Sequence, residues 1–189
     1  MINFSYAKSL GYHTDPYKII SVADANDNEL TKIYEHRPDE RTRYIIYSKI
    51  LHELAGKDHR IDFRMRNYFD DWGVNSLTLD FGYAVKLKNG RTVEPFIRLY
   101  GQTAADFYMR TIPYDGTGTF DELTLPEFAS SDMRLAEATT VTIGGKFRLP
   151  VGDGSVDLRA GYMLQNFNDA IFGDNSAVFF TVDFGQVFE

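Results

Sequence analysis

The amino-acid sequence predicts an all-β protein, an antiparallel up-and-down transmembrane β-barrel of about eight strands. The clearest sign is residues 76–87, in which six apolar side chains alternate with six polar or small ones. Because a strand turns successive side chains to opposite faces, this stretch has one apolar and one polar face. It is about a dozen residues long, whereas an ordinary strand has ~5–6 and a strand that crosses a bilayer needs ~9–11.

The same alternation recurs along the chain and predicts eight strands. They are expected at residues 2–7, 42–54, 60–69, 76–87, 93–100, 139–148, 156–165 and 178–188. The second of these has a mixed pattern. Pro95 lacks a backbone donor, so it is expected at an edge, a bulge or a strand end. Helical periodicity is weak, and short loop helices are expected at most within 28–36 and 128–138.

The connections between the expected strands alternate in length. Short turns follow the second, fourth and sixth strands, at 55–58, 88–91 and 150–154; Asn89-Gly90 suits a tight hairpin. Longer or irregular connections follow the others, at 11–40, 70–75, 111–133 and 166–176. Antiparallel order then gathers the short turns at one end and the long loops at the other. This layout is typical of bacterial outer-membrane barrels, with short periplasmic turns and long outer loops.

Composition excludes several other classes of protein. The net charge of −7 gives no basic footprint for nucleic acid. Cysteine is absent, and none of the four histidines has the spacing of a metal site, so neither a metal nor a cofactor is expected. No run approaches the ~18 apolar residues of a membrane-spanning helix. The length of 189 residues suits a single domain, residues 1–189.

Alternation alone does not say which face points inward. A soluble barrel buries its apolar face, and a membrane barrel exposes that face to lipid. Strand length, aromatic residues near strand ends and charges of both signs on the polar face favour lipid; an ordinary solvated sheet face is the alternative. The charged residues expected to line the lumen are Asp62, Arg64, Arg66, Asp80, Lys86, Glu94, Arg98, Lys146, Arg148, Asp157, Arg159 and Asp183.

Two segments are distinctive: YFDDWGVNS at 68–76 and RLYGQTAADFY at 98–108. With residues 11–12, 15–18 and 41–44, they resemble a family of bacterial outer-membrane β-barrel proteins that carries a domain-of-unknown-function label. The resemblance implies a Gram-negative outer membrane, contact with its lipid and with the barrel-assembly machinery, and a longer parent with a signal peptide and further N-terminal strands. Residues 1–189 would then be the C-terminal part of a larger barrel. It implies no catalytic residues.

The expected function is that of a porin-like passive channel for small solutes, with the charged ladder as its lining. An eight-stranded barrel is filled by its own side chains, whereas a wider one conducts, so the diameter decides. The alternative is a structural or surface-interaction barrel that acts through its loops at 10–40 and 111–133.

A lipid-acting enzyme is the third reading, and its rim candidates are His13, Asp70, Asp71 and Ser76. His52 is a weaker candidate that could point into the lumen, although a structural role is preferred. Residues 70–73 predict a tight outer turn, with Trp72 anchored at the membrane interface. The acidic stretch 24–29 resembles a calcium loop only loosely, and a solvated loop is preferred.

Overall fold

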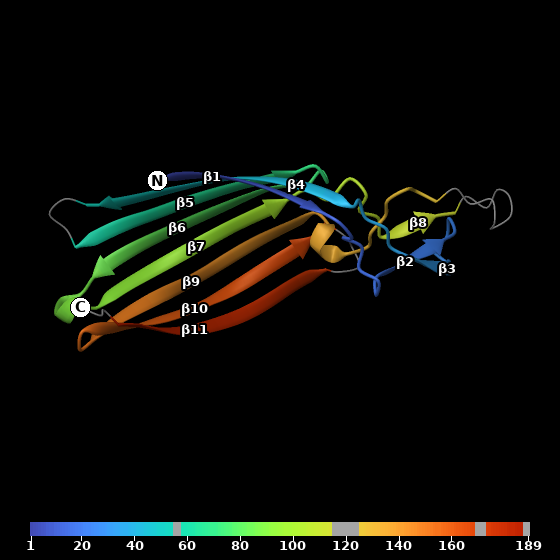
Figure 1. Cartoon of the computed structure of the whole chain (residues 1–189). Coiled ribbons are helices and arrows are strands. Elements are labelled where there is room, and N and C mark those ends of the chain that lie inside the picture. Colours follow the sequence, from blue (N-terminus) through green and yellow to red (C-terminus); the bar gives the residue numbers. More distant parts are fainter. Residues whose placement is uncertain (55–57, 115–124, 169–172, 187–189) are drawn as a thin grey trace.

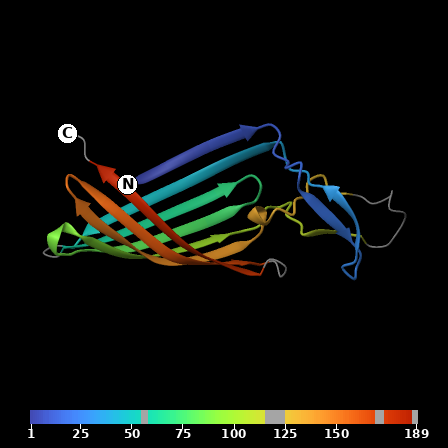
Figure 2. The same cartoon turned by 90° about the horizontal axis from the view of Figure 1, so that it is seen from below.

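A curved eight-stranded antiparallel sheet, the main sheet, dominates the computed structural model, which describes residues 1–54, 58–114, 125–168 and 173–186 (Figures 1 and 2). The strand order is β1-β4-β5-β6-β7-β9-β10-β11, so neighbours in sequence are neighbours in space. The strands are β1 (Ile2–Leu10), β4 (Glu40–Glu53), β5 (His59–Asp70), β6 (Asn75–Lys86), β7 (Thr92–Gln102), β9 (Ala138–Val151), β10 (Gly154–Phe167) and β11 (Asp174–Gln186).

All eight predicted strands are present, and each boundary lies within four residues of the expected one. Adjacent strands pair antiparallel throughout, which confirms the up-and-down order. The turn between β6 and β7 holds Asn89 and Gly90 at φ of 63° and 73°, the left-handed conformation of a tight hairpin. The short turns lie at one end of the sheet and the longer connections at the other (Figure 1).

The main sheet is an open arc and does not close into a barrel by itself. Among the described residues, β1 pairs only with β4, and β11 pairs only with β10. The outer edge of β1 and that of β11 therefore have no partner strand among the described residues. No helix in the described ranges combines the length and the apolar character needed to span a membrane.

The expectation of a loop at 11–40 was wrong. This segment folds into the hairpin β2 (Ile19–Ala23) and β3 (Glu29–Tyr34), and β8 (Thr111–Pro113) pairs parallel to β2. Together they form the small sheet at the long-loop end (Figure 1). Its strands are too short for alternation to separate them from a loop, and a strand replaces the helix considered at 28–36. A short 3-10 helix at Met133–Leu135 lies within the other considered segment, while part of the 111–133 loop lies outside the described residues.

The two faces of the main sheet are the inverse of those in a water-soluble sheet. Ile143, on the outer face, is 61% exposed, whereas Asp62 on the opposite, concave face is 5% exposed. The described apolar cores lie instead at the long-loop end, around Trp72 and around Ile20 and Val22. The main sheet therefore presents its apolar side chains outward and packs its charged ones against each other.

Two glycines of the concave face are covered by aromatic rings. A Cβ on Gly144 would lie 2.6 Å from the Phe96 ring and 2.4 Å from the Ala160 carbonyl oxygen, and one on Gly161 would lie 2.5 Å from the Phe179 ring. The rings lie in these hollows because register places each beside a glycine on the next strand. Glycine kinks covered by aromatic rings bend sheets toward closure.

We expect Gly144→Ala to destabilise the sheet by about 1–3 kcal/mol, the usual cost of overpacking, because the added methyl group would clash with the Ala160 carbonyl oxygen. Its neighbour Gly145 provides a matched control, since a Cβ there meets nothing within 4 Å. Urea unfolding of both variants in detergent measures the difference. Equal midpoints for the two variants would contradict the packing described here.

Candidate functional site on the concave face

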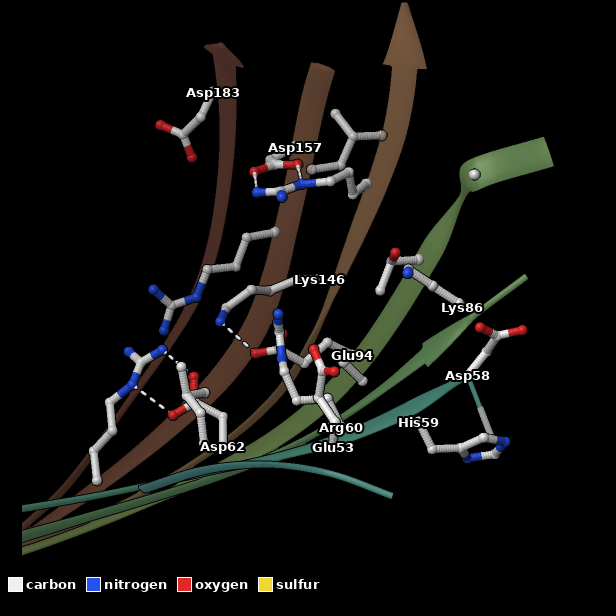
Figure 3. A pocket seen from close by; sticks show the side chains of 18 of the residues that line it. Glu53, Asp58, His59, Arg60, Asp62, Lys86, Glu94, Lys146, Asp157 and Asp183 are labelled. Atoms are coloured by element: carbon white, nitrogen blue, oxygen red, sulfur yellow. Dashed lines mark hydrogen bonds and ion pairs between the residues drawn. The ribbon is translucent and has the colours of Figure 1, made fainter. Parts of the chain in front are cut away.

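A cavity of about 690 Å³ lies on the concave face, and its lining comes from seven strands and the turns beside them. Ionised side chains dominate this lining, with Lys49, Arg60, Glu94, Lys146 and Arg159 among them (Figure 3). The register explains this gathering, because the polar positions of paired strands face the same side. The site is therefore a charged trough formed by the wall itself.

Glu94 is the centre of the best-connected group of charges. Lys146 Nζ lies 2.6 Å from its Oε1, and Arg60 Nη2 lies 3.3 Å from its Oε2. Arg60 is on β5 and Glu94 on β7, so the contact passes over β6. That strand presents the small residues Gly82 and Ala84 here, and Glu94 Oε1 is 3.0 Å from the position of a Cβ on Gly82. Small side chains on β6 thus let one carboxylate join three strands.

Three further ion pairs brace the wall. Arg98 binds Asp80 across β6 and β7 at 2.6 Å, and Arg148 binds Asp157 across β9 and β10 at 2.6 Å through two hydrogen bonds. Arg64 binds Asp62 within β5 at 2.5 Å. A cationic side chain thereby balances the charge of each of four acids, Asp62, Asp80, Glu94 and Asp157. A half-buried charge keeps its ionised form when a partner compensates its lost hydration.

The structure places all twelve charged residues predicted for the lumen on the concave face. Eight of them form the ion pairs just described, while Arg66 and Arg159 stack on aromatic rings. Lys86 and Asp183 have no ion-pair partner among the described residues. Arg60, Phe96 and Phe179 also lie on this face, at positions that the alternation assigns to the polar side, whereas Lys49 on β4 was not predicted there. The mixed pattern of β4 hid Lys49, and the two rings are apolar at positions expected to be polar.

Asp70, a candidate for enzymatic chemistry, has a structural task. Its Oδ1 accepts hydrogen bonds from the backbone N–H groups of Trp72 and Val74 at 3.1 and 3.0 Å, and its Oδ2 binds Arg41 at 2.6 Å. Asp71 accepts a hydrogen bond from a backbone N–H of β4. The predicted tight turn is confirmed by these bonds. Both carboxylates are occupied in holding it.

The remaining rim candidates do not assemble into a catalytic group. The His13 ring meets the edge of Trp72 at 5.6 Å, and its Nε2 has no hydrogen-bond partner among the described residues. Trp72 itself is buried and donates its Nε1–H to Glu40 O, so the expected interfacial anchor was wrong. Ser76 faces Tyr68 in the register, and His52 lies on the outer face opposite Ile61, so neither accompanies His13.

A second charged cluster lies at the long-loop end, beside the small sheet. Arg37 donates to Glu35 at 3.0 Å and to Asp132 at 2.8 Å, and Ser130 Oγ donates to Glu35 at 2.5 Å. Burial opposes the ionised form of Asp132, but hydrogen bonds from Arg134 and Arg37 outweigh it and hold its pKa well below the usual range. The cluster joins the chain before β4 to the segment before β9.

The acidic stretch 24–29 is the turn of the β2–β3 hairpin. Asp24 Oδ1 accepts hydrogen bonds from the backbone N–H groups of Asn26 and Asn28 at 2.8 and 2.9 Å. These bonds, first of all those from Asn28, lower the pKa of Asp24. No group of three or more metal-ligating side chains occurs in the parts of the chain that the structure describes.

Comparison with known proteins gives a family and no activity. Searches of curated proteins and of solved structures each returned no match. Residues 1–181 match the family described as "Protein of unknown function (DUF3570)". Since that match spans nearly all of its 189 residues, the chain belongs to the DUF3570 family.

Proposed function

We propose that this chain forms the wall of an outer-membrane β-barrel in a Gram-negative bacterium and that the barrel is a passive channel for small solutes. The single observation that supports this most strongly is the inverted arrangement of the main sheet. Most of its aliphatic and aromatic side chains point outward into the surroundings, and most of its ionised side chains pair on the concave face. Insertion would use the barrel-assembly machinery, and lipid would contact the outer face.

The surroundings decide whether such a sheet is stable. The largest exposed apolar patch on a soluble monomer is typically ~300–600 Å². Here, exposed large apolar residues occur on all eight strands of the main sheet, from Ile2 on β1 to Phe184 on β11. In water this face would drive aggregation, whereas contact with hydrocarbon carries no free-energy cost for apolar side chains. The physical balance therefore favours lipid.

An aromatic group near the long-loop end of the outer face supports the same proposal. Tyr6, Tyr44 and Phe69 lie side by side on β1, β4 and β5, with ring centroids 5.4 and 5.1 Å apart. Aromatic rings with a polar tip are enriched where hydrocarbon meets headgroups. The group thus suits one interfacial girdle of a barrel wall.

Conduction depends on how the wall is completed. Both edges of the main sheet are open, and a barrel much wider than eight strands, such as one of about 16–18, leaves a water-filled lumen. The concave face suits that role because its charges would be solvated on one side and paired along the wall. A surface-interaction barrel is the second candidate, and the small sheet, which has its own buried cluster around Ile20 and Val22, favours it.

The test reconstitutes the purified chain into lipid vesicles and planar bilayers. We expect protease-resistant strands in vesicles and stepwise ionic currents in bilayers. An inserted protein without currents would favour the surface-interaction barrel. A chain that stays folded, monomeric and dispersed in buffer without detergent would refute the membrane proposal altogether.

A further inference from the structure

The concave face carries an excess of positive charge although the whole chain is acidic. Its strands present eleven cationic side chains against seven acidic ones, while the net charge of the chain is −7. The cationic residues are Arg41, Arg43, Lys49, Arg60, Arg64, Arg66, Lys86, Arg98, Lys146, Arg148 and Arg159, and the acidic ones are Glu53, Asp62, Asp70, Asp80, Glu94, Asp157 and Asp183. The net charge of the concave face is therefore opposite in sign to that of the chain.

One level of the trough gathers three cations near Glu94. Register places Lys146 directly opposite Glu94 on one side and Arg159 on the other, and Arg60 reaches the same carboxylate from β5. Three cations thus lie around Glu94, and a second acid of this level, Glu53, faces Arg60 in the register. Asp183, on β11, faces the same cavity one step nearer the short turns.

Arg159 is held by ring stacking rather than by hydrogen bonds. Its guanidinium carbon lies 4.6 Å from the centroid of the Phe96 ring and 5.3 Å from that of Phe179. Ring stacking orients the guanidinium plane without using its N–H groups, and the buried Nε has no hydrogen-bond partner among the described residues, which leaves the terminal Nη groups to meet a ligand. A planar guanidinium with free donors is suited to a two-point contact with carboxylate or phosphate.

From this geometry we infer that Arg159, with Lys146 beside it, is a binding site for small oxyanions of the carboxylate or phosphate type, and that it makes the lumen anion-selective. The selectivity rests on the proposed channel function, whereas the binding does not. Oxyanions would enter the cavity, exchange part of their water for the Arg159 fork and leave along the remaining cations. Weak binding of this kind permits passage.

The test uses the chain in planar bilayers under a KCl gradient, with inorganic phosphate as the probe. The reversal potential is expected to show that Cl⁻ permeates faster than K⁺, and phosphate is expected to reduce the chloride current. Arg159→Gln should lose the anion preference and weaken the phosphate effect about tenfold or more, since a charge-assisted hydrogen bond contributes ~1.5–3 kcal/mol. Arg159→Lys should keep the preference but weaken the phosphate effect, because the fork is lost.

Lys32→Gln is the matched control, because Lys32 lies on β3, outside the concave face, and the same charge is removed. A cation-selective wild type, or a phosphate effect unchanged in Arg159→Gln, overturns the inference. Phosphate binding to the detergent-folded chain, followed by ³¹P line width, separates the two proposals. Binding that depends on Arg159 without any current would refute the channel and sustain the site, and absence of both would overturn both.

Discussion

Leu99→Arg is expected to prevent stable assembly of this chain in lipid while leaving the concave face intact. Leu99 is on the outer face of β7, opposite Leu79 and Val141 and two residues from the middle of the strand. An arginine near the bilayer midplane on the lipid face of a barrel costs about 2–4 kcal/mol. The measurement is the fraction of protein that becomes protease-resistant when it is folded into vesicles.

The small sheet supplies a control of the same chemical change. Leu30, on β3, is 46% exposed and Leu99 is 43% exposed, so the two leucines are almost equally accessible in the isolated chain. In water the two substitutions should be equally mild, whereas in a membrane only Leu99→Arg enters hydrocarbon. Equal assembly of Leu99→Arg and Leu30→Arg would refute the outward orientation toward lipid. The comparison separates the effect of contact with hydrocarbon from the effect of solvent exposure alone, which a single variant cannot do.

The sequence predicted the main sheet well because its signal is long and repeated. Alternation over a dozen residues fixes both the strand and its faces, so β6 was placed within one residue at each end. The small sheet escaped because β2 and β8 have five and three residues, and few positions cannot show a period. Closure also lay beyond the pattern, since it depends on what pairs with β1 and β11.

The candidate site shows the same division. Parity along each strand was enough to place Arg64, Asp80 and Arg159 on the concave face. It could not show which charges meet, because Arg60 reaches Glu94 only across the small residues of β6. It also misplaced Trp72, since a tryptophan near a strand end reads as an interfacial anchor unless its buried partners are known. Pairing and burial are properties of the assembled sheet.

Arg37→Met is expected to lower the free energy of opening at the long-loop end by about 3–5 kcal/mol. This is the usual cost of leaving a buried charge without its partner. The side chain of Arg37 is 9% exposed, and that of Glu35, to which it is bound, is fully buried. Without the guanidinium, Glu35 keeps only neutral donors, Ser130 Oγ and the backbone N–H of Asp15. Hydrogen exchange at the amides of β2 measures the opening free energy.

Two further variants identify the cause of that loss. Arg134→Met removes a cation from the same cluster, but the side chain of Arg134 is 71% exposed and Asp132 keeps its bond to Arg37, so the expected change is smaller than that of Arg37→Met. Adding Glu35→Gln to Arg37→Met removes the uncompensated carboxylate and should recover part of the lost protection. If the double variant exchanges as fast as Arg37→Met alone, lost packing rather than buried charge opens the structure. Recovered protection would instead show that the buried ion pair holds the segment before β4 against the segment before β9.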